Sequence, residues 1–175
     1  MKDFLLLANV NAITYKDFFP LLKEGKARGG YNFNKTLMFE TQEGEKSGPN
    51  IAWYTTLPTP NKRKLILTKK YKHTEYPHYD NYNAIEVGRI KDIPYDYNCV
   101  MGVPITIFGY DLDNVEVEGL AADYGEGECF VRGTPVYVDE QHPKSTCMVL
   151  NNKMKYARVL IKKKDCDNGR RGDTQ

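Results

Sequence analysis

The chain has 175 residues, of which 41% are hydrophobic and 27% are charged, as is typical of a globular protein with one domain or one domain and a small appendage. A net charge of +2 is too small to indicate a nucleic-acid partner by itself. No stretch approaches the roughly 18 apolar residues of a membrane-spanning helix, and Asp3 precedes a short apolar run that does not resemble a signal peptide. We therefore expect a cytoplasmic protein with no membrane partner.

Residues 4–15 (FLLLANVNAITY) predict a strand followed by polar turn residues and the start of a helix. The continuous apolar run is expected of a strand buried on both faces. Such a strand would carry Asn9 and Asn11 to its carboxyl end, where ligands bind in open α/β sheets. With nothing before this strand to supply the rest of such a sheet, we expect the chain to be the second half of a larger enzyme.

A helix is predicted from about residue 15 to residue 24, with Gly25 as its stop. Pro20 lies inside this range, so either the helix kinks there or it begins near Phe19. Residues 31–41 and 50–57 are predicted to form an antiparallel pair of strands, because only a polar loop lies between them. Residues 64–71 predict a third strand.

Residues 71–97 contain six of the 13 tyrosines, broken up by Pro, Asn and Asp. Long loops of this kind in compact domains are functional or disordered, and the aromatic content argues against disorder. Further on, a strand is predicted at 102–108, and residues 115–121 alternate with the period of a half-buried strand. Short strands are predicted at 135–139 and 146–150.

Two asparagines, Asn151 and Asn152, predict a tight turn that joins residues 147–150 to residues 156–161 as a hairpin. The polar tail, residues 165–175, is predicted to be disordered.

Charge is distributed unevenly along the chain. Residues 62–72 carry six basic and no acidic residues, and residues 153–164 carry six more, whereas residues 111–128 carry seven acids and no Lys or Arg. Such segregation can form a basic surface that contacts phosphates. The alternative, equally weighted, is that these lysines only solvate exposed strands.

The chemistry-bearing residues form no complete catalytic set. Four cysteines and three histidines complete no zinc-ligand spacing, so we expect free thiols and no metal. His78 and Asp80 are close in sequence, but such proximity is common. Trp53 and Tyr54 lie on a predicted strand, where an aromatic ring could stack on an extruded base. The alternative is that Trp53 anchors the core while Tyr54 faces the other way.

The order of several segments resembles the EcoRI-like adenine-specific DNA methyltransferases. The matching stretches are FLLLANVNAITYKDFFPLLKEGK, NIAWYTTL, EYPHYDNYNAIEV, RIKDIPYDYNCVMGVPITIF and KYARVLIKK. YDNYNAIEV and MGVPITIF are the most distinctive of these, and the resemblance covers about residues 3–164. It corresponds to the carboxyl part of those enzymes.

The resemblance implies transfer of a methyl group from S-adenosylmethionine to N6 of adenine in a specific duplex DNA site, with the target base extruded from the stack. The family's Asn-Pro-Pro-aromatic motif would lie just before residues 4–10, and no Asn-Pro dipeptide occurs in this sequence. The glycine loop that binds the cofactor would lie further upstream. The catalytic group and most of the cofactor pocket would therefore be supplied by an amino-terminal half, and this chain alone is expected to be inactive.

The same resemblance assigns residues to the target base and to DNA. Asn9 and Asn11 would lie near the lip of the active site, and Trp53 or Tyr54 would face the extruded adenine. The Tyr-rich segment and MGVPITIF would belong to target recognition, where a few side chains read base edges and basic residues grip phosphates. The predicted phosphate contacts are Lys69, Lys70, Lys72 and Arg89.

The predicted fold class is α/β: the late strands of a Rossmann-like class I methyltransferase sheet with an appended β-rich target-recognition region, together an incomplete domain. Residues 1–70 would be the carboxyl-terminal part of the catalytic domain, residues 71–164 the target-recognition region with returning strands, and residues 165–175 the tail. The alternative function is a non-catalytic DNA-binding or accessory remnant of a broken restriction-modification gene.

Overall fold

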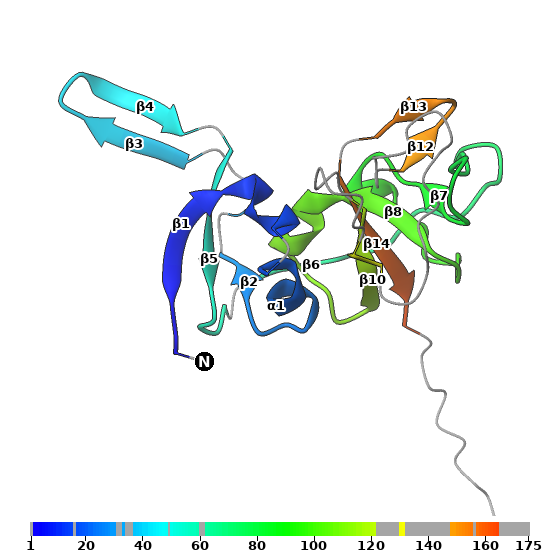
Figure 1. The fold of residues 1–175 in the computed structure, drawn as a ribbon, viewed down its shortest axis with the longest axis horizontal. Coiled ribbons are helices and arrows are strands. Elements are labelled where there is room, and N and C mark those ends of the chain that lie inside the picture. Colours follow the sequence, from blue (N-terminus) through cyan, green and yellow to red (C-terminus); the bar gives the residue numbers. More distant parts are fainter. Residues whose placement is uncertain are drawn as a thin grey trace, which may run out of the picture.

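A computed structural model describes residues 2–15, 17–30, 33, 37–48, 50–59, 62–121, 130–131, 148–155 and 157–164. Strands dominate this mixed α/β structure (Figure 1), which agrees with the predicted α/β class. The strands are β1 (Leu5–Asn9), β2 (Arg28–Gly29), β3 (Leu37–Thr41), β4 (Gly44–Gly48), β5 (Ile51–Thr55), β6 (Arg63–Lys64), β7 (Ile85–Glu86), β8 (Met101–Pro104), β9 (Tyr110–Asp111), β10 (Val115–Ala121), β11 (Phe130–Val131), β12 (Val149–Leu150), β13 (Lys153–Met154) and β14 (Arg158–Lys163). The helices are α1 (Phe19–Lys23) and the 3₁₀ helices η1 (Val10–Thr14), η2 (Ile90–Asp92) and η3 (Ile105–Gly109).

The first sheet has three antiparallel strands in the order β1-β5-β2. The predicted pairing of residues 50–57 with residues 31–41 is wrong, because β5 pairs with β1 and β2, whereas β3 pairs with β4. The turn of that separate hairpin contains Gly44 at φ +107°, a conformation that favours glycine. The hairpin projects from the rest of the molecule (Figure 1).

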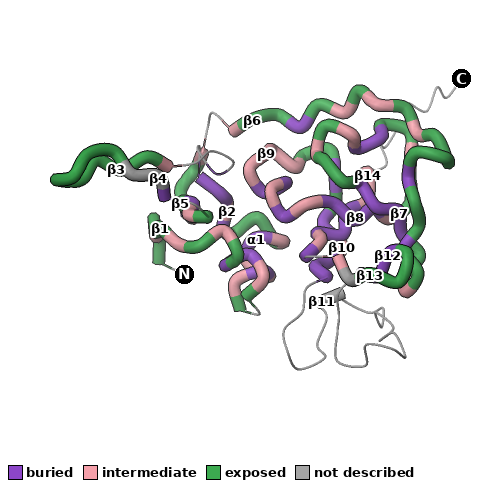
Figure 2. Tube along the Cα trace, turned by 90° about the horizontal axis from the view of Figure 1, so that it is seen from above, coloured by how far each residue is buried: buried purple, intermediate pink, exposed green. Residues whose placement is uncertain are grey.

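Strand β1 lies at the edge of this sheet and is not buried. Leu5, Leu6 and Leu7 are 60%, 37% and 40% exposed, and Figure 2 shows much of this strand in the colour of exposed residues. The prediction of a strand buried on both faces is therefore wrong for the described part of the chain. The physical reason is that β5 is the one described strand beside β1, so its outer edge and much of its surface remain uncovered.

Helix α1 is shorter than the predicted range and begins at Phe19, as the alternative start near that residue predicted. Pro20 is tolerated because it lies in the first turn, where its missing N–H has no intrahelical partner. Gly25, at φ +68°, follows the helix end in the left-handed conformation that glycine adopts without strain.

The second sheet has the order β11-β10-β14-β8-β7. The alternating pattern of residues 115–121 correctly predicts β10, which pairs with β14 through a register shift between Val117 and Gly119. The strand predicted at 102–108 gives way to η3 after Pro104. The strand predicted at 64–71 is reduced to β6, which pairs in parallel with β9, and to an isolated bridge from Lys69 to Pro94.

The predicted tight turn is present at Asn151 and Asn152, whose φ angles are +52° and +57°. Asparagine tolerates this conformation better than most residues. The partner predicted for this hairpin is wrong, since β12 pairs with β13, whereas β14 joins the five-stranded sheet. The predicted strand at 135–139 and the tail at 165–175 lie outside the described residues.

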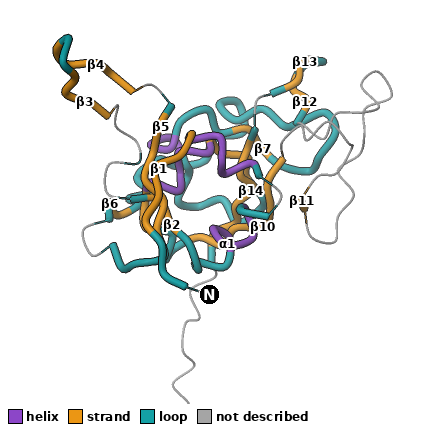
Figure 3. The backbone as a smooth tube through the Cα atoms, turned by 60° about the vertical axis from the view of Figure 1, so that its left-hand side comes forward, coloured by secondary structure: helices purple, strands orange, loops and turns teal. Residues whose placement is uncertain are grey.

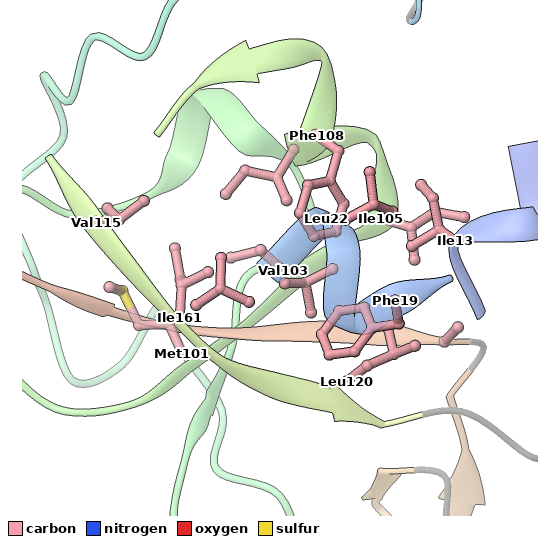
Figure 4. Packing of buried hydrophobic residues seen from close by; sticks show 14 of the residues in the cluster. Ile13, Phe19, Leu22, Met101, Val103, Ile105, Phe108, Val115, Leu120 and Ile161 are labelled. Carbon is pink, nitrogen blue, oxygen red and sulfur yellow. The ribbon is translucent and has the colours of Figure 1, made fainter. Parts of the chain in front are cut away.

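One buried cluster joins the two sheets. The helices lie between them (Figure 3), and side chains from η1 and α1 meet side chains from the five-stranded sheet and η3 (Figure 4). The labelled residues of this cluster are Ile13, Phe19, Leu22, Met101, Val103, Ile105, Phe108, Val115, Leu120 and Ile161. The cluster therefore includes residues on both sides of the predicted boundary at residue 70. No helix in the described ranges is long and apolar enough to cross a membrane.

Candidate nucleic-acid interface

The two basic segments of the sequence meet at one groove. This groove of about 760 Å³ is lined by Lys64, Leu65, Ile66, Leu67, Tyr95, Asp111, Asp113, Asn114, Lys163 and Lys164. The parallel pairing of β6 with β9 aligns Lys64 with Asp111, and the end of β14 is held by the Lys164 N–H, which donates to the Asn114 carbonyl at 3.2 Å. Lysines about one hundred positions apart in sequence thereby share a surface.

The groove combines positive charge with exposed apolar surface. Among the residues that the structure describes, neither Lys64 nor Lys164 forms an ion pair. Lys163 donates to the Tyr95 carbonyl at 2.8 Å. Ile66 is 72% exposed and contributes an apolar part of the lining. Free ammonium groups beside apolar surface are suited to a phosphate backbone and its sugars.

Asp111 and Asp113 reduce the net positive charge of the groove. Asp111 accepts the backbone N–H of Asp113 at 3.2 Å. Both carboxylates also line a neighbouring groove of about 580 Å³, which includes Lys62. Burial lowers the pKa of Lys62, and the nearby charge of Asp111 partly offsets this effect. The groove therefore carries both lysines and carboxylates, with Lys64 in register with Asp111.

Three of the four predicted phosphate contacts form ion pairs within the chain. Lys69 lies 2.9 Å from Glu75 and 3.8 Å from Asp92, and Lys72 lies 2.9 Å from Glu75. Arg89 pairs with Asp92 at 2.7 Å. The hydrogen bond that Lys69 donates to Glu75 raises the pKa of Lys69, and the hydrogen bonds that Glu75 accepts from Lys72 and Lys69 lower the pKa of Glu75. The basic members of these pairs are exposed and screened by solvent, and each of them already has a carboxylate partner.

Lys70 differs from these three residues. It is exposed and forms no ion pair with any residue in the described ranges. Lys70 directly follows Lys69, which forms an isolated β-bridge with Pro94. This bridge holds the backbone next to Lys70 in place.

The predicted target-base residues divide into exposed and buried members. Asn9 and Asn11 are exposed at the carboxyl end of β1, and the Asn9 side chain accepts the Asn11 N–H at 2.8 Å. That bond caps η1. Trp53 is 37% exposed, whereas Tyr54 is fully buried, which is the reverse of the core-anchor alternative considered for the sequence.

Tyr54 has a positioning role in the structure. Its hydroxyl donates to the Val10 carbonyl at 2.8 Å, and Phe18 and Phe33 pack edge-on against its ring at centroid distances of 5.0 and 5.5 Å. Burial raises the pKa of its hydroxyl, so the group stays a neutral donor. Tyr54 thereby holds the turn between Asn9 and Asn11 rather than presenting its ring at the surface.

A buried ionic cluster joins the Tyr-rich segment to β14, and neither its members nor their contacts were predicted. Arg158 donates to Glu86 through Nη2 at 2.8 Å and Nε at 3.0 Å, and the Tyr79 hydroxyl donates to the same carboxylate. Burial acts to raise the pKa of Glu86, but the hydrogen bonds from Arg158 and Tyr79 outweigh it, and the pKa lies below its ordinary value. Burial and the Glu86 carboxylate raise the pKa of Tyr79.

The sequence carried a weak signal for this cluster, namely single charged residues inside the apolar stretches AIEV and ARVLI. Asp80, considered above beside His78, is also structural. Its carboxylate accepts the Asn152 N–H at 2.8 Å and so ties the β12–β13 turn to the Tyr-rich segment.

The structure is a strand-rich α/β fold with a surface groove in which lysines from both basic segments meet. The chain belongs to the family described as "Adenine-specific methyltransferase EcoRI", whose model matches residues 1–164. The predicted resemblance to the EcoRI-like methyltransferases is confirmed.

Curated relatives are Type II methyltransferases. The chain is 38% identical to M.EcoRI of Escherichia coli over 93% of this chain and 51% of that protein. It is 32% identical to M.MgeORF184P of Mycoplasma genitalium and 30% identical to M.MpnI of Mycoplasma pneumoniae, each over 93% of this chain and 57% of the relative. The chain thus spans about half the length of the curated relatives it matches. No solved structure gives a significant match.

Proposed function

We propose that this chain is part of a site-specific DNA methyltransferase that transfers a methyl group from S-adenosylmethionine to N6 of adenine in duplex DNA. In this proposal it supplies the late strands of a Rossmann-like sheet, in residues 1–70, and a target-recognition region, in residues 71–164. The membership in the EcoRI family supports the reaction class. The single structural observation that carries the role on DNA is the groove where Lys64, Lys163 and Lys164 meet.

The two grooves described above are not built from the predicted target-base residues. Their linings include lysines and aspartates, and Asn9, Asn11 and Trp53 line neither of them. The carbonyl of Val10, beside these asparagines, already accepts the Tyr54 hydroxyl. We therefore assign the cofactor pocket and the Asn-Pro-Pro-aromatic motif to an amino-terminal half of the enzyme and derive no chemical step through the cofactor here.

Within this proposal, Asn9, Asn11 and Trp53 flank the position of the extruded adenine, and Tyr54 acts through the turn that it holds. Lys64, Lys163 and Lys164 contact phosphates, with Lys70 as a further contact. Lys69, Lys72 and Arg89 remain predicted contacts that must exchange partners with Glu75 or Asp92 before they reach DNA.

The salt dependence of DNA binding tests this assignment. Fluorescence anisotropy would follow a labelled duplex with the wild-type chain and with the triple variant Lys64→Ala, Lys163→Ala, Lys164→Ala. Each phosphate contact contributes a slope of about 0.9 to the plot of log affinity against log salt, so the variant should lose roughly 3 from that slope. The matched control is Lys2→Ala, Lys26→Ala, Lys153→Ala, which removes three exposed lysines outside the groove. Equal slopes for the two variants would remove the groove from the interface.

Methyl transfer tests the reaction. Labelled S-adenosylmethionine and duplex DNA would be incubated with this chain, with the amino-terminal half of M.EcoRI, and with both. We expect transfer in the mixture and none with this chain alone. Turnover by the isolated chain would refute the assignment of the catalytic group to the other half. DNA binding without transfer in the mixture would instead support a non-catalytic DNA-binding remnant.

A further inference from the structure

The cationic groove holds side chains that contact with a phosphate backbone alone does not require. Lys64, Lys163 and Lys164 share the groove with Asp111 and Asp113, and carboxylates repel phosphates. The lining also includes an exposed aromatic and an exposed aliphatic side chain. A nucleotide whose base is unpaired has parts that match all three kinds of side chain. It offers an anionic phosphate, a flat ring face and a base edge with hydrogen-bond donors.

The apolar part of the groove is formed by one tyrosine and one isoleucine. Ile66 is 72% exposed and Tyr95 is 43% exposed, and both line the groove. The Lys163 ammonium donates to the Tyr95 carbonyl at 2.8 Å, so a cation lies at the residue that carries the ring. An aromatic ring in a positively charged groove is the combination that binds unpaired bases, because the ring stacks on the base and the cation contacts the phosphate.

The backbone on both sides of Tyr95 is held in place. The Tyr95 N–H donates to the Lys69 carbonyl at 2.9 Å, and the preceding Pro94 forms the isolated bridge with Lys69. The following Asp96 accepts the Tyr71 N–H at 2.6 Å. A tyrosine on a backbone fixed in this way loses little conformational freedom when a base stacks on it, and this pre-organisation favours binding.

The acidic part of the groove is a short turn that leads into β10. The Val115 N–H donates to the Leu112 carbonyl at 3.1 Å, and the Asp111 carboxylate accepts the Asp113 N–H. Asp113 and Asn114 are exposed in this turn. A carboxylate accepts a hydrogen bond from the exocyclic amine of cytosine, and an asparagine amide matches adenine, whereas thymine has no exocyclic amine. The turn therefore favours a base that carries an exocyclic amine.

We propose that the groove binds one unpaired nucleotide of a DNA strand, whose base stacks on Tyr95, whose phosphate contacts Lys163 and whose exocyclic amine donates to Asp113. The preferred bases are adenine and cytosine. This assignment rests on the proposed function and deepens it, because it names the form of DNA that the groove takes. The groove volume of about 760 Å³ lies within the range of about 300–1,000 Å³ that is usual for small-ligand sites.

The residues proposed to flank the extruded adenine do not line this groove, so the bound nucleotide would be a second one in addition to that adenine. Three other occupants are outcomes of the test: a fully paired duplex, a free nucleotide and an acidic peptide.

Fluorescence anisotropy would compare a fully paired duplex with the same duplex extended by a short single-stranded overhang of adenine, cytosine or thymine. We expect the wild-type chain to bind the adenine and cytosine overhangs more tightly than the paired duplex. Tyr95→Ala should weaken binding of these overhangs by about 5- to 150-fold through loss of one stacked base, with little change for the paired duplex. Tyr95→Phe keeps the ring and should bind as the wild type does. The matched control is Tyr15→Ala, which removes a tyrosine that is 59% exposed outside the groove.

Two further measurements place the base in the groove. Asp113→Asn should lower the preference for cytosine over thymine by about 2- to 12-fold, as expected for loss of one hydrogen bond. An overhang that contains 8-azidoadenine should crosslink on illumination to Tyr95 or Ile66, which mass spectrometry would identify. Crosslinks confined to residues outside the groove would overturn the assignment.

The remaining outcomes also decide between the occupants. Equal losses for the paired duplex and the overhangs in Tyr95→Ala overturn the stacking site, and equal affinity for all three overhangs overturns the preferred bases. Competition by free dAMP as strong as that by the adenine overhang identifies a free nucleotide as the occupant. Equally strong competition by a polyglutamate peptide identifies an acidic peptide, and either result overturns the assignment to DNA.

The paired duplex separates this inference from the proposed function. If the triple lysine variant loses its salt slope on the paired duplex but Tyr95→Ala binds every probe as the wild type does, the proposed function stands and the unpaired nucleotide is overturned. If overhang binding depends on Tyr95 but the salt slope on the paired duplex does not depend on the three lysines, the unpaired nucleotide is supported and the groove is not the duplex interface.

Discussion

Replacing Arg158 by methionine should destabilise the fold through the carboxylate that it leaves behind. Glu86 is 7% exposed and accepts hydrogen bonds from Nε and Nη2 of Arg158 and from the Tyr79 hydroxyl. Removal of one partner of a buried pair typically costs about 3–5 kcal/mol, because the other charge is left uncompensated. Urea unfolding followed by far-ultraviolet circular dichroism should show a loss of this size. The total free energy of unfolding of a domain is roughly 5–15 kcal/mol, so this loss would remove a large part of it.

The matched control is Arg89→Met. Arg89 also pairs with a carboxylate, that of Asp92 at 2.7 Å, but its side chain is mostly exposed. Exposed pairs contribute about 0–1 kcal/mol, so this variant should be nearly as stable as the wild type. Equal losses for Arg158→Met and Arg89→Met would refute the reasoning that burial decides the effect.

The pH dependence of the same variant provides an independent check. In the wild type the folded pKa of Glu86 is lowered, so the stability from the pair is fully present above the unfolded pKa and is lost as the pH falls through the folded value. In Arg158→Met the burial of Glu86 acts without its cation and raises the folded pKa. The variant should therefore lose most stability at neutral pH and recover towards pH 5 as the carboxyl binds a proton. The double variant Glu86→Gln, Arg158→Met should recover most of the loss at pH 7. A deficit that is unchanged between pH 7 and pH 5 would refute the electrostatic explanation.

Three further changes have expected outcomes that equilibrium unfolding can measure. Gly102→Ala should destabilise the protein by about 1–3 kcal/mol, because a Cβ there would lie 2.8 Å from two atoms of the Tyr79 ring. A Gly102→Ala variant as stable as the wild type would show that Tyr79 can move aside without loss of stability. Tyr54→Phe should cost about 1–3 kcal/mol by leaving the Val10 carbonyl without its donor, and no loss would refute the anchoring of the turn by the hydroxyl. Asn9→Ala should cost about 0.5–2 kcal/mol of stability through loss of the η1 cap. In the mixture of this chain with the amino-terminal half of M.EcoRI, the same variant should also slow methyl transfer. Full activity of the variant would show that Asn9 does not act at the target base.

The sequence predicts those parts of the structure that depend on local pattern. The alternation of residues 115–121 predicts β10, and the pair Asn151–Asn152 predicts a turn with positive φ angles. Pairing between distant segments was not predictable in the same way. Residues 50–57 carry no signal that distinguishes β1 from β3 as their neighbour, and the separate β3–β4 hairpin formed because a Gly at position 44 permits a turn within the polar stretch.

The candidate site shows the same limit. The basic segments were evident from composition, but the meeting of Lys64 with Lys163 and Lys164 depends on the β6–β9 pairing and on the end of β14. Glu75 and Asp92, which pair with Lys69 and Arg89, lie in a segment without a helical or strand periodicity. The sequence therefore does not predict where these acids lie relative to the basic residues. Burial of β1 was predicted from its apolar run alone. Such a run indicates a strand, and it does not show whether the strand lies at the edge or in the centre of its sheet.

The groove and the three-stranded sheet are built on different parts of the fold. The groove uses β6, β9 and the end of β14, whereas the sheet consists of β1, β5 and β2, and no residue of these three strands lines the groove. A buried cluster in which α1 packs against the five-stranded sheet joins these parts (Figure 4). Substitutions at sites without shared partners add within about 0.3–0.5 kcal/mol. Tyr54→Phe combined with the triple lysine variant should therefore lose the stability that Tyr54→Phe alone loses and the DNA affinity that the triple variant alone loses, because the Tyr54 hydroxyl and the groove lysines share no partner.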